Sequence, residues 1–181
     1  MNSTIYSSKE KKHNRTRIFY TVMDSSIGKL VIASTDHGLV RILLPREGGF
    51  DFMSSLHKAY PDATLIEDQG KNQNVMNQLR EYFDGNRTGF SLSLELRGTE
   101  FQKSVWKAVA QVPYGQTRSY GEIAQEVGRP KAFRAVGNAN RMNPIPIVIP
   151  CHRIIGSDGS MTGFGGGIPL KIKLLKIEKM T

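Results

Sequence analysis

The stretch Asn143-Pro144-Ile145-Pro146-Ile147-Val148-Ile149-Pro150-Cys151-His152-Arg153 holds the only cysteine of a chain of 181 residues. Each proline fixes its own φ angle and pushes the residue before it toward an extended conformation. The three prolines therefore predict a rigid arm that delivers Cys151 to one defined place. Because neighbouring side chains of a strand point to opposite faces, Cys151 and His152 can act together only if the chain turns at Pro150.

Two interpretations of Cys151 follow from its surroundings. A thiol beside an imidazole is the raw material of a nucleophile, and a helix starting after Pro150 would favour the thiolate through its exposed N–H groups. On composition alone, however, a lone cysteine after Ile-Val-Ile is more often a small buried hydrophobic residue. The motif by itself leaves both interpretations open.

Size and composition indicate a globular protein with one domain or two small ones. Hydrophobic residues make up 39% of the chain and include eight Phe, six Tyr and one Trp. A single cysteine excludes an intrachain disulfide and fits a reducing compartment. The N-terminal segment lacks the apolar core of a secretory signal, and no run of about 18 apolar residues could span a membrane. We therefore expect a cytoplasmic protein without a membrane partner.

The formal net charge of +9 is concentrated in the half that contains Cys151. Residues 101–181 carry twelve Lys and Arg against four Asp and Glu, whereas residues 18–100 carry eight against eleven. A basic half indicates a polyanionic partner, because neutralised phosphates supply most non-specific nucleic-acid affinity. A merely solvated surface is the alternative. The basic segment 1–16 is expected to be a disordered tail that can still touch phosphate.

Neither a metal nor a cofactor is expected. The four histidines are scattered along the chain, and one cysteine cannot complete a thiolate-rich zinc site. No glycine-rich phosphate loop of standard spacing is present.

Residues 17–96 are expected to form a small α/β domain with antiparallel hairpin strands and no visible chemistry, so that its role is structural. Alternation and turn signals predict strands at 17–23, 29–35, 38–44, 63–67 and 90–96. Helical periodicity predicts helices at 52–59 and 74–83.

Residues 97–181 are expected to form a mostly helical domain. Capping boxes start helices at Thr99 and Ser119. A short helix 120–127, a turn with Gly128, and a second helix 131–140 together give the helix-turn-helix pattern, which is weak evidence for DNA binding on its own. A glycine-rich loop at 156–167 and a terminal helix at 170–177 complete the domain. The overall class is therefore α+β.

Taken together, these motifs resemble the O6-alkylguanine-DNA alkyltransferases. Pro150-Cys151-His152-Arg153 after Asn143-Pro144-x-Pro146 resembles their active-site motif, and the resemblance extends through Ser119-Tyr120, Arg134-Ala135-Val136-Gly137, the glycine loop and Glu178. It covers roughly residues 99–178 and implies single-turnover, direct-reversal repair of O6-alkylguanine. It leaves open whether O4-alkylthymine is a further substrate.

The resemblance implies a catalytic role for five residues. Cys151 would accept the alkyl group, and His152 would deprotonate it through a water while Glu178 fixes the imidazole tautomer. Asn143 would hold this network in place. Tyr120 would donate a hydrogen bond to guanine N3 and stabilise the leaving base.

The resemblance also implies how DNA is held. Arg134 would enter a duplex bound through the minor groove and fill the space of the flipped base. The DNA-contacting residues would be Gly121, Arg129, Arg134, Arg153 and Ser157, and the guanine pocket would be lined by Pro146, Ile154, Phe164 and Gly165. One thiol repairs one base, so a monomer would suffice. Phe164 and Gly165 replace a tyrosine and a serine of some members, which would change the tolerance for bulky alkyl groups.

Three other functions are compatible with parts of the sequence. A protein that only flags lesions would need no cysteine at position 151. A cysteine hydrolase would use Cys151 and His152, but would need neither Tyr120 nor a basic half. A helix-turn-helix regulator would keep its function in a Cys151→Ala variant.

Overall fold

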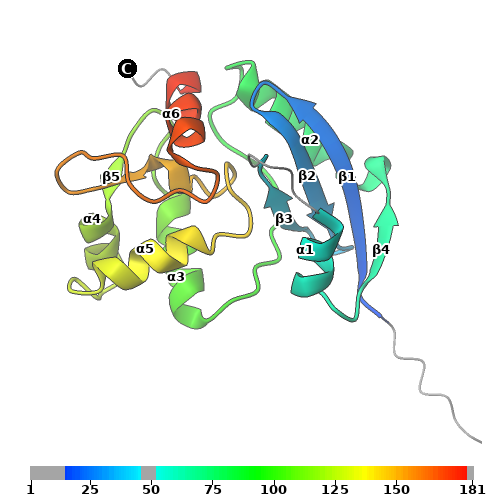
Figure 1. The fold of residues 1–181 in the computed structure, drawn as a ribbon, viewed down its shortest axis with the longest axis horizontal. Coiled ribbons are helices and arrows are strands. Elements are labelled where there is room, and N and C mark those ends of the chain that lie inside the picture. The colour runs from blue at the N-terminus through cyan, green and yellow to red at the C-terminus, as the bar shows by residue number, and fades with distance from the viewer. Residues whose placement is uncertain (1–14, 46–51, 179–181) are drawn as a thin grey trace, which may run out of the picture.

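The computed structural model describes residues 15–45 and 52–178, which form two halves lying side by side (Figure 1). The N-terminal half is a four-stranded sheet with two helices, and the C-terminal half is mostly helical. The predicted α+β class is confirmed. Apart from Arg15 and Thr16, the predicted tail lies outside the described residues.

The sheet has the order β3-β2-β1-β4. Strands β1 (Arg17–Ser25), β2 (Gly28–Ser34) and β3 (Leu39–Leu43) follow one another as antiparallel hairpins, as the sequence predicts. Strand β4 (Thr64–Glu67) returns beside β1 and runs parallel to it.

Alternating side chains of the sheet enter two different hydrophobic layers. One face packs Ile18, Ala33 and Val40 against Leu56 of helix α1 (Phe52–Ala59). The other face packs against helix α2 (Gln69–Phe83) and joins the core of the C-terminal half. Helix α2 begins before the predicted residue 74 because the Asp68 side chain caps it, accepting a hydrogen bond from Lys71 N at 3.0 Å.

The predicted strand at 90–96 is wrong. This segment makes one isolated bridge, in which the Leu39 backbone pairs with the Ser93 carbonyl and the Glu95 amide at 2.9 Å each. Further along the same strand, Ile42 N donates to the Pro144 carbonyl at 2.9 Å. Because β3 is already occupied there by the segment that leads to Cys151, residues 90–96 cannot extend their pairing.

The C-terminal half is built from α3 (Glu100–Ala110), α4 (Tyr120–Glu126), α5 (Phe133–Arg141) and α6 (Ile168–Ile177), with short strands β5 (Arg118–Ser119) and β6 (Ile154–Ile155) paired in parallel. Both predicted capping boxes are present, at Thr99 and Ser119. Gly128 has a φ of 71°, as a glycine that ends a helix requires.

Helix α5 begins at Phe133 and not at residue 131 as predicted. Residues 129–132 form a turn of their own, in which Ala132 N donates to the Arg129 carbonyl at 2.8 Å. The connection between α4 and α5 is therefore longer than the short turn expected for a helix-turn-helix. Trp106 of α3 holds α5 to the core through a 2.8 Å hydrogen bond from Nε1 to the Ala139 carbonyl.

In the described part of the chain, no helix has the length and apolar character needed to cross a membrane.

Candidate active site

The segment from Asn143 to Pro150, predicted as a rigid arm, is a tight loop. Ile149 N donates to the Ile145 carbonyl at 2.9 Å, and Ile147 has a φ of 77°, a strained value for a β-branched residue. Asn143 closes this loop from both ends. Its Oδ1 accepts from Ile145 N at 3.0 Å, and its Nδ2 donates to the Ile149 carbonyl at 2.8 Å.

The chain turns at Pro150, as cooperation between the thiol and the imidazole requires. Residues Cys151–Arg153 form a single 3-10 turn, η1, which Arg153 N closes with a 2.9 Å hydrogen bond to the Pro150 carbonyl. Cys151 is 4% exposed and His152 is fully buried. The two side chains leave the turn in different directions: Cys151 borders a cavity, and His152 points into the protein toward the end of α6.

His152 and Glu178 form a buried pair. His152 Nε2 lies 2.8 Å from Glu178 Oε1, and Arg153 holds the same carboxylate through Nε at 2.9 Å to Oε2 and Nη2 at 2.9 Å to Oε1. Glu178 caps the C-terminal end of α6 and also accepts from Gly115 N at 3.1 Å. The carboxylate is thus saturated with donors and fixed in orientation.

The titration behaviour of the pair assigns the imidazole tautomer. Burial tends to raise the pKa of Glu178, but hydrogen bonds from His152 and Arg153 and the charge of Arg153 outweigh it and hold the pKa at about 2. Burial lowers the pKa of His152 despite the attraction of Glu178. A neutral imidazole beside a carboxylate must carry its proton on Nε2. Nδ1 is then an acceptor, and it has no hydrogen-bond partner among the described residues.

The resting thiol is protonated, contrary to the expectation that the site favours thiolate. Burial raises the pKa of Cys151 to about 11. A hydrogen bond with Asn143, the nearby backbone N–H groups and the Lys171 ammonium oppose this shift without cancelling it. Cys151 therefore needs a base at the moment of reaction, and a neutral Nδ1 on the adjacent residue is suited to that task.

Arg153 does not lie where a DNA contact requires. It is 5% exposed, and its guanidinium is held by Glu178 and by the Val112 carbonyl at 2.5 Å. The prediction that Arg153 binds DNA is contradicted by this burial. Its observed role is to neutralise Glu178, because a buried carboxylate without a paired cation is costly.

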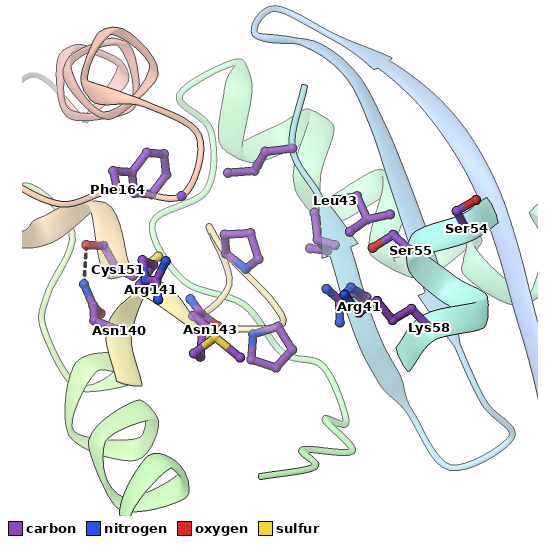
Figure 2. A pocket seen from close by; sticks show the side chains of 16 residues that line it. Arg41, Leu43, Ser54, Ser55, Lys58, Asn140, Arg141, Asn143, Cys151 and Phe164 are labelled. Carbon is purple, nitrogen blue, oxygen red and sulfur yellow. Dashed lines mark hydrogen bonds between the residues drawn. The ribbon is translucent and has the colours of Figure 1, made fainter. Parts of the chain in front are cut away.

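The cavity beside Cys151 has a volume of about 980 Å³ and is shared between the two halves. Figure 2 shows Cys151, Asn140, Asn143 and Phe164 on one side and Arg41, Leu43, Ser54, Ser55 and Lys58 of the N-terminal half on the other. Pro146 and Gly165 also line it, as predicted for the substrate pocket. Ile154 does not line it. Its carbonyl accepts a hydrogen bond from Lys171 instead.

Tyr120 and the glycine loop lie against each other at a second hollow of the surface. The Tyr120 hydroxyl donates to the carbonyls of Thr162 and Gly163, 3.1 Å away in each case. Lys171, whose pKa burial lowers to about 8, donates to Thr162 at 2.7 Å and so ties the loop to β6. Gly137 of α5 packs on the Tyr120 ring, where a Cβ atom would lie 3.7 Å from it.

Most residues predicted to contact DNA are accessible from solvent. Arg129, Arg134 and Ser157 are exposed and Gly121 is partly exposed. They are joined by Phe133, a half-exposed aromatic residue beside Arg134 that the sequence analysis did not single out.

Three residues near Cys151 were missed. Asn140 is 3% exposed, lines the cavity and donates from Nδ2 to the Cys151 carbonyl at 3.3 Å. Lys171 reads in sequence as a surface residue of α6 but is fully buried. Tyr82 of α2 donates from its hydroxyl to Glu178 Oε1 at 2.7 Å. No local pattern marks any of them, because each acquires its partner only in the folded chain.

Comparison with known proteins places this arrangement in a family. Residues 18–96 match the ribonuclease-like domain of 6-O-methylguanine DNA methyltransferase, and residues 100–180 match its DNA binding domain. The chain belongs to the 6-O-methylguanine DNA methyltransferase family. The predicted family resemblance is confirmed, and the family's activity is direct-reversal repair by alkyl transfer to a cysteine.

Individual members of the 6-O-methylguanine DNA methyltransferase family cover nearly the whole chain. A methylated-DNA–protein-cysteine methyltransferase of Methanosarcina barkeri is 43% identical over 90% of this chain and 98% of its own length. The solved O6-methylguanine methyltransferase of Mycobacterium tuberculosis has a TM-score of 0.78 and 44% identity, covering 90% of this chain and 93% of that one. The M. tuberculosis protein has also been solved in complex with DNA, with a TM-score of 0.77 and 42% identity over 90% of this chain and 92% of that one.

Proposed function

We propose that this chain repairs duplex DNA by moving an alkyl group, in the first place methyl, from O6 of guanine to Sγ of Cys151. The observation that carries the proposal is a protonated lone thiol at the wall of a cavity, next to a buried neutral imidazole held by a carboxylate. Alkyl transfer needs a nucleophile that an adjacent general base can activate, and this arrangement supplies one.

The reaction is a displacement at the alkyl carbon. The thiol proton passes through a bridging water to His152 Nδ1, while the Nε2–H group of His152 keeps its hydrogen bond to Glu178. The S–C bond then forms as the C–O6 bond breaks, and the electron pair leaves with the guanine. A donor such as the Tyr120 hydroxyl stabilises the charge that develops on the base. Asn143 keeps the nucleophile's loop closed during the step.

The product is a thioether, which has no carbonyl for water to attack. The chain offers no second cysteine to which the group could be passed. Each molecule should therefore react once. O4-alkylthymine presents the same type of alkyl–oxygen bond and is a further candidate substrate. A thiol that must stay reduced fits a cytoplasmic location.

The C-terminal half, residues 97–181, would hold the DNA, and residues 17–96 would support it. In this half, Arg129, Arg134 and Ser157 are exposed and Gly121 is partly exposed. We infer that the α4–α5 pair approaches the minor groove as a helix-turn-helix and that Arg134 fills the space left by the flipped base. One monomer carries all the groups that the reaction needs.

Intact-protein mass after incubation with duplex DNA containing O6-methylguanine tests the proposal. A stoichiometric gain of one methyl group, absent in Cys151→Ala, is expected. Binding without a change in mass would indicate a protein that only flags lesions or regulates transcription. Repeated turnover of an ester or amide would indicate a hydrolase.

A further inference from the structure

Tyr82 brings a hydroxyl of the N-terminal half into the His152–Glu178 pair. It lies near the end of α2, is fully buried, and packs its ring against Phe83, Phe90 and Tyr114 with centroid distances of 5.5, 5.6 and 6.1 Å. Its hydroxyl donates to Glu178 Oε1 at 2.7 Å and lies 3.5 Å from His152 Nε2. Residues 82 and 178 are 96 positions apart in the sequence.

Three side chains therefore donate to one oxygen. Glu178 Oε1 accepts from Tyr82 at 2.7 Å and from His152 Nε2 at 2.8 Å, and Arg153 Nη2 approaches it at 2.9 Å. Tyr82 stays protonated because burial and the neighbouring carboxylate both raise its pKa far above the usual range. It is a permanent donor to this oxygen.

We propose that Tyr82 is a positioning residue for alkyl transfer, through which the N-terminal half orients Glu178 and limits its pull on His152. The inference rests on the proposed function of Cys151 and His152 and extends it to a residue of the other half. A bond donated to Oε1 withdraws charge from the oxygen that would stabilise a protonated imidazole. Tyr82 thereby helps to keep His152 neutral and Nδ1 free to accept the thiol proton.

A Tyr82→Phe substitution leaves the other titratable groups around His152 unchanged. The titratable or charged side chains that act on it are Lys171 from α6, Glu178 at the C-cap of α6, Arg153 from η1 and Tyr82 from α2. Only Tyr82 can lose its hydrogen bond to the pair while its ring, and so its packing, is retained. Tyr82→Phe removes a single oxygen atom.

Tyr114 supplies a matched control. It belongs to the same aromatic cluster, and its hydroxyl donates to the Ile177 carbonyl at 3.0 Å and not to Glu178. Tyr114→Phe therefore makes the same chemical change next to the site without touching the shared oxygen.

The test is the pH dependence of Cys151 reactivity in folded wild type, Y82F and Y114F, checked by circular dichroism at the assay temperature. Two reactions are followed by intact mass: alkyl transfer from free O6-benzylguanine, and labelling by iodoacetamide, for which Cys151 is the only thiol. In Y82F the acidic limb of both profiles should move to higher pH by about half a unit, since His152 becomes easier to protonate. In Y114F the limb should stay in place.

The same measurement in a Glu178→Gln variant shows whether Tyr82 acts through the carboxylate. If Tyr82 acts through the carboxylate, adding Y82F to E178Q should shift the limb no further. Coincident wild-type and Y82F profiles, or an equal additional shift in the E178Q background, would overturn the proposal. Because iodoacetamide needs no alkylguanine chemistry, a labelling shift without any alkyl transfer would reject the proposed function and still support the role of Tyr82.

Discussion

At the scale of single residues, the site consists of an acid and a base that are both uncharged at rest. Burial raises the pKa of Cys151 to about 11 and lowers that of His152. Such a pair is stable in a buried site because neither member is an unpaired charge. In the proposed mechanism the thiolate forms when the thiol proton moves to Nδ1, so the chemistry would depend on one atom of one side chain.

His152→Ala should therefore lower the rate of alkyl transfer at pH 7 by about 10²–10⁴-fold, the usual contribution of a general base. Without the base, the rate should climb steadily as pH rises toward the thiol pKa of about 11. Single-turnover rates with free O6-benzylguanine between pH 6 and 10 provide the measurement. A rate in the variant that is independent of pH would contradict the assigned role.

Glu178 makes stability depend on pH in the acid range. Its folded pKa of about 2 lies below its ordinary value of 4.5, so the folded state binds the proton less well than the unfolded chain does. Its contribution is complete above about pH 5 and is lost as pH falls from there toward 2. The difference corresponds to about 3 kcal/mol. Urea unfolding between pH 3 and 7 gives the free energy of unfolding at each pH. This free energy should rise with pH in the wild type, and its slope should be much smaller in Glu178→Gln.

At the scale of elements, a loop and two helices set the geometry of the site. The loop before Cys151 holds Ile147 at a positive φ, and the buried side chains of Ile145 and Ile149 together with both hydrogen bonds of Asn143 offset that strain. Helix α6 ends at Glu178 and so fixes the partner of His152. Helix α5 presents Arg134 to solvent beside Phe133, whose ring its guanidinium approaches to 5.9 Å.

Arg134→Ala should separate DNA handling from chemistry. If Arg134 fills the space of the flipped base, the variant should repair O6-methylguanine in duplex DNA at least about tenfold more slowly, because extrusion costs a few kcal/mol. Transfer from free O6-benzylguanine should stay within about twofold of wild type, since a free base needs no extrusion. Equal losses on both substrates would place Arg134 in the transfer step instead.

At the scale of the whole molecule, charge and packing are divided between the halves. The basic surplus lies in residues 101–181, and the N-terminal half supplies one wall of the cavity and the Tyr82 hydroxyl. The hydrophobic core runs from the sheet through α2 into α3 and α6 without a break. The two halves are therefore one structural unit at the active site, although the sequence suggests a structural half and a chemical half.

Binding to undamaged duplex DNA should weaken steeply with salt. Four exposed cations lie on or next to α5, namely Arg129, Lys131, Arg134 and Arg141. Neutralising about four phosphates predicts a loss of about a hundredfold in affinity between 50 and 200 mM salt. Fluorescence anisotropy over this range measures the slope. A nearly flat dependence would show that this surface does not bind the phosphate backbone.

The sequence by itself determined the class of fold and the capped helices, and its family resemblance singled out Cys151 as the proposed nucleophile. Those features rest on local signals: a helix cap involves residues three apart, alternation involves neighbours, and the motif around Cys151 is contiguous. The strand predicted at 90–96 failed because the partner edge of β3 is taken by the Pro144 carbonyl, which only the folded chain brings there. Only the tertiary structure decided that Arg153 is buried against Glu178, that Lys171 is inside, and that Tyr82 reaches the same carboxylate across 96 residues. A polar side chain takes its role from the groups that surround it after folding, and contacts between distant segments leave no periodic trace in the sequence.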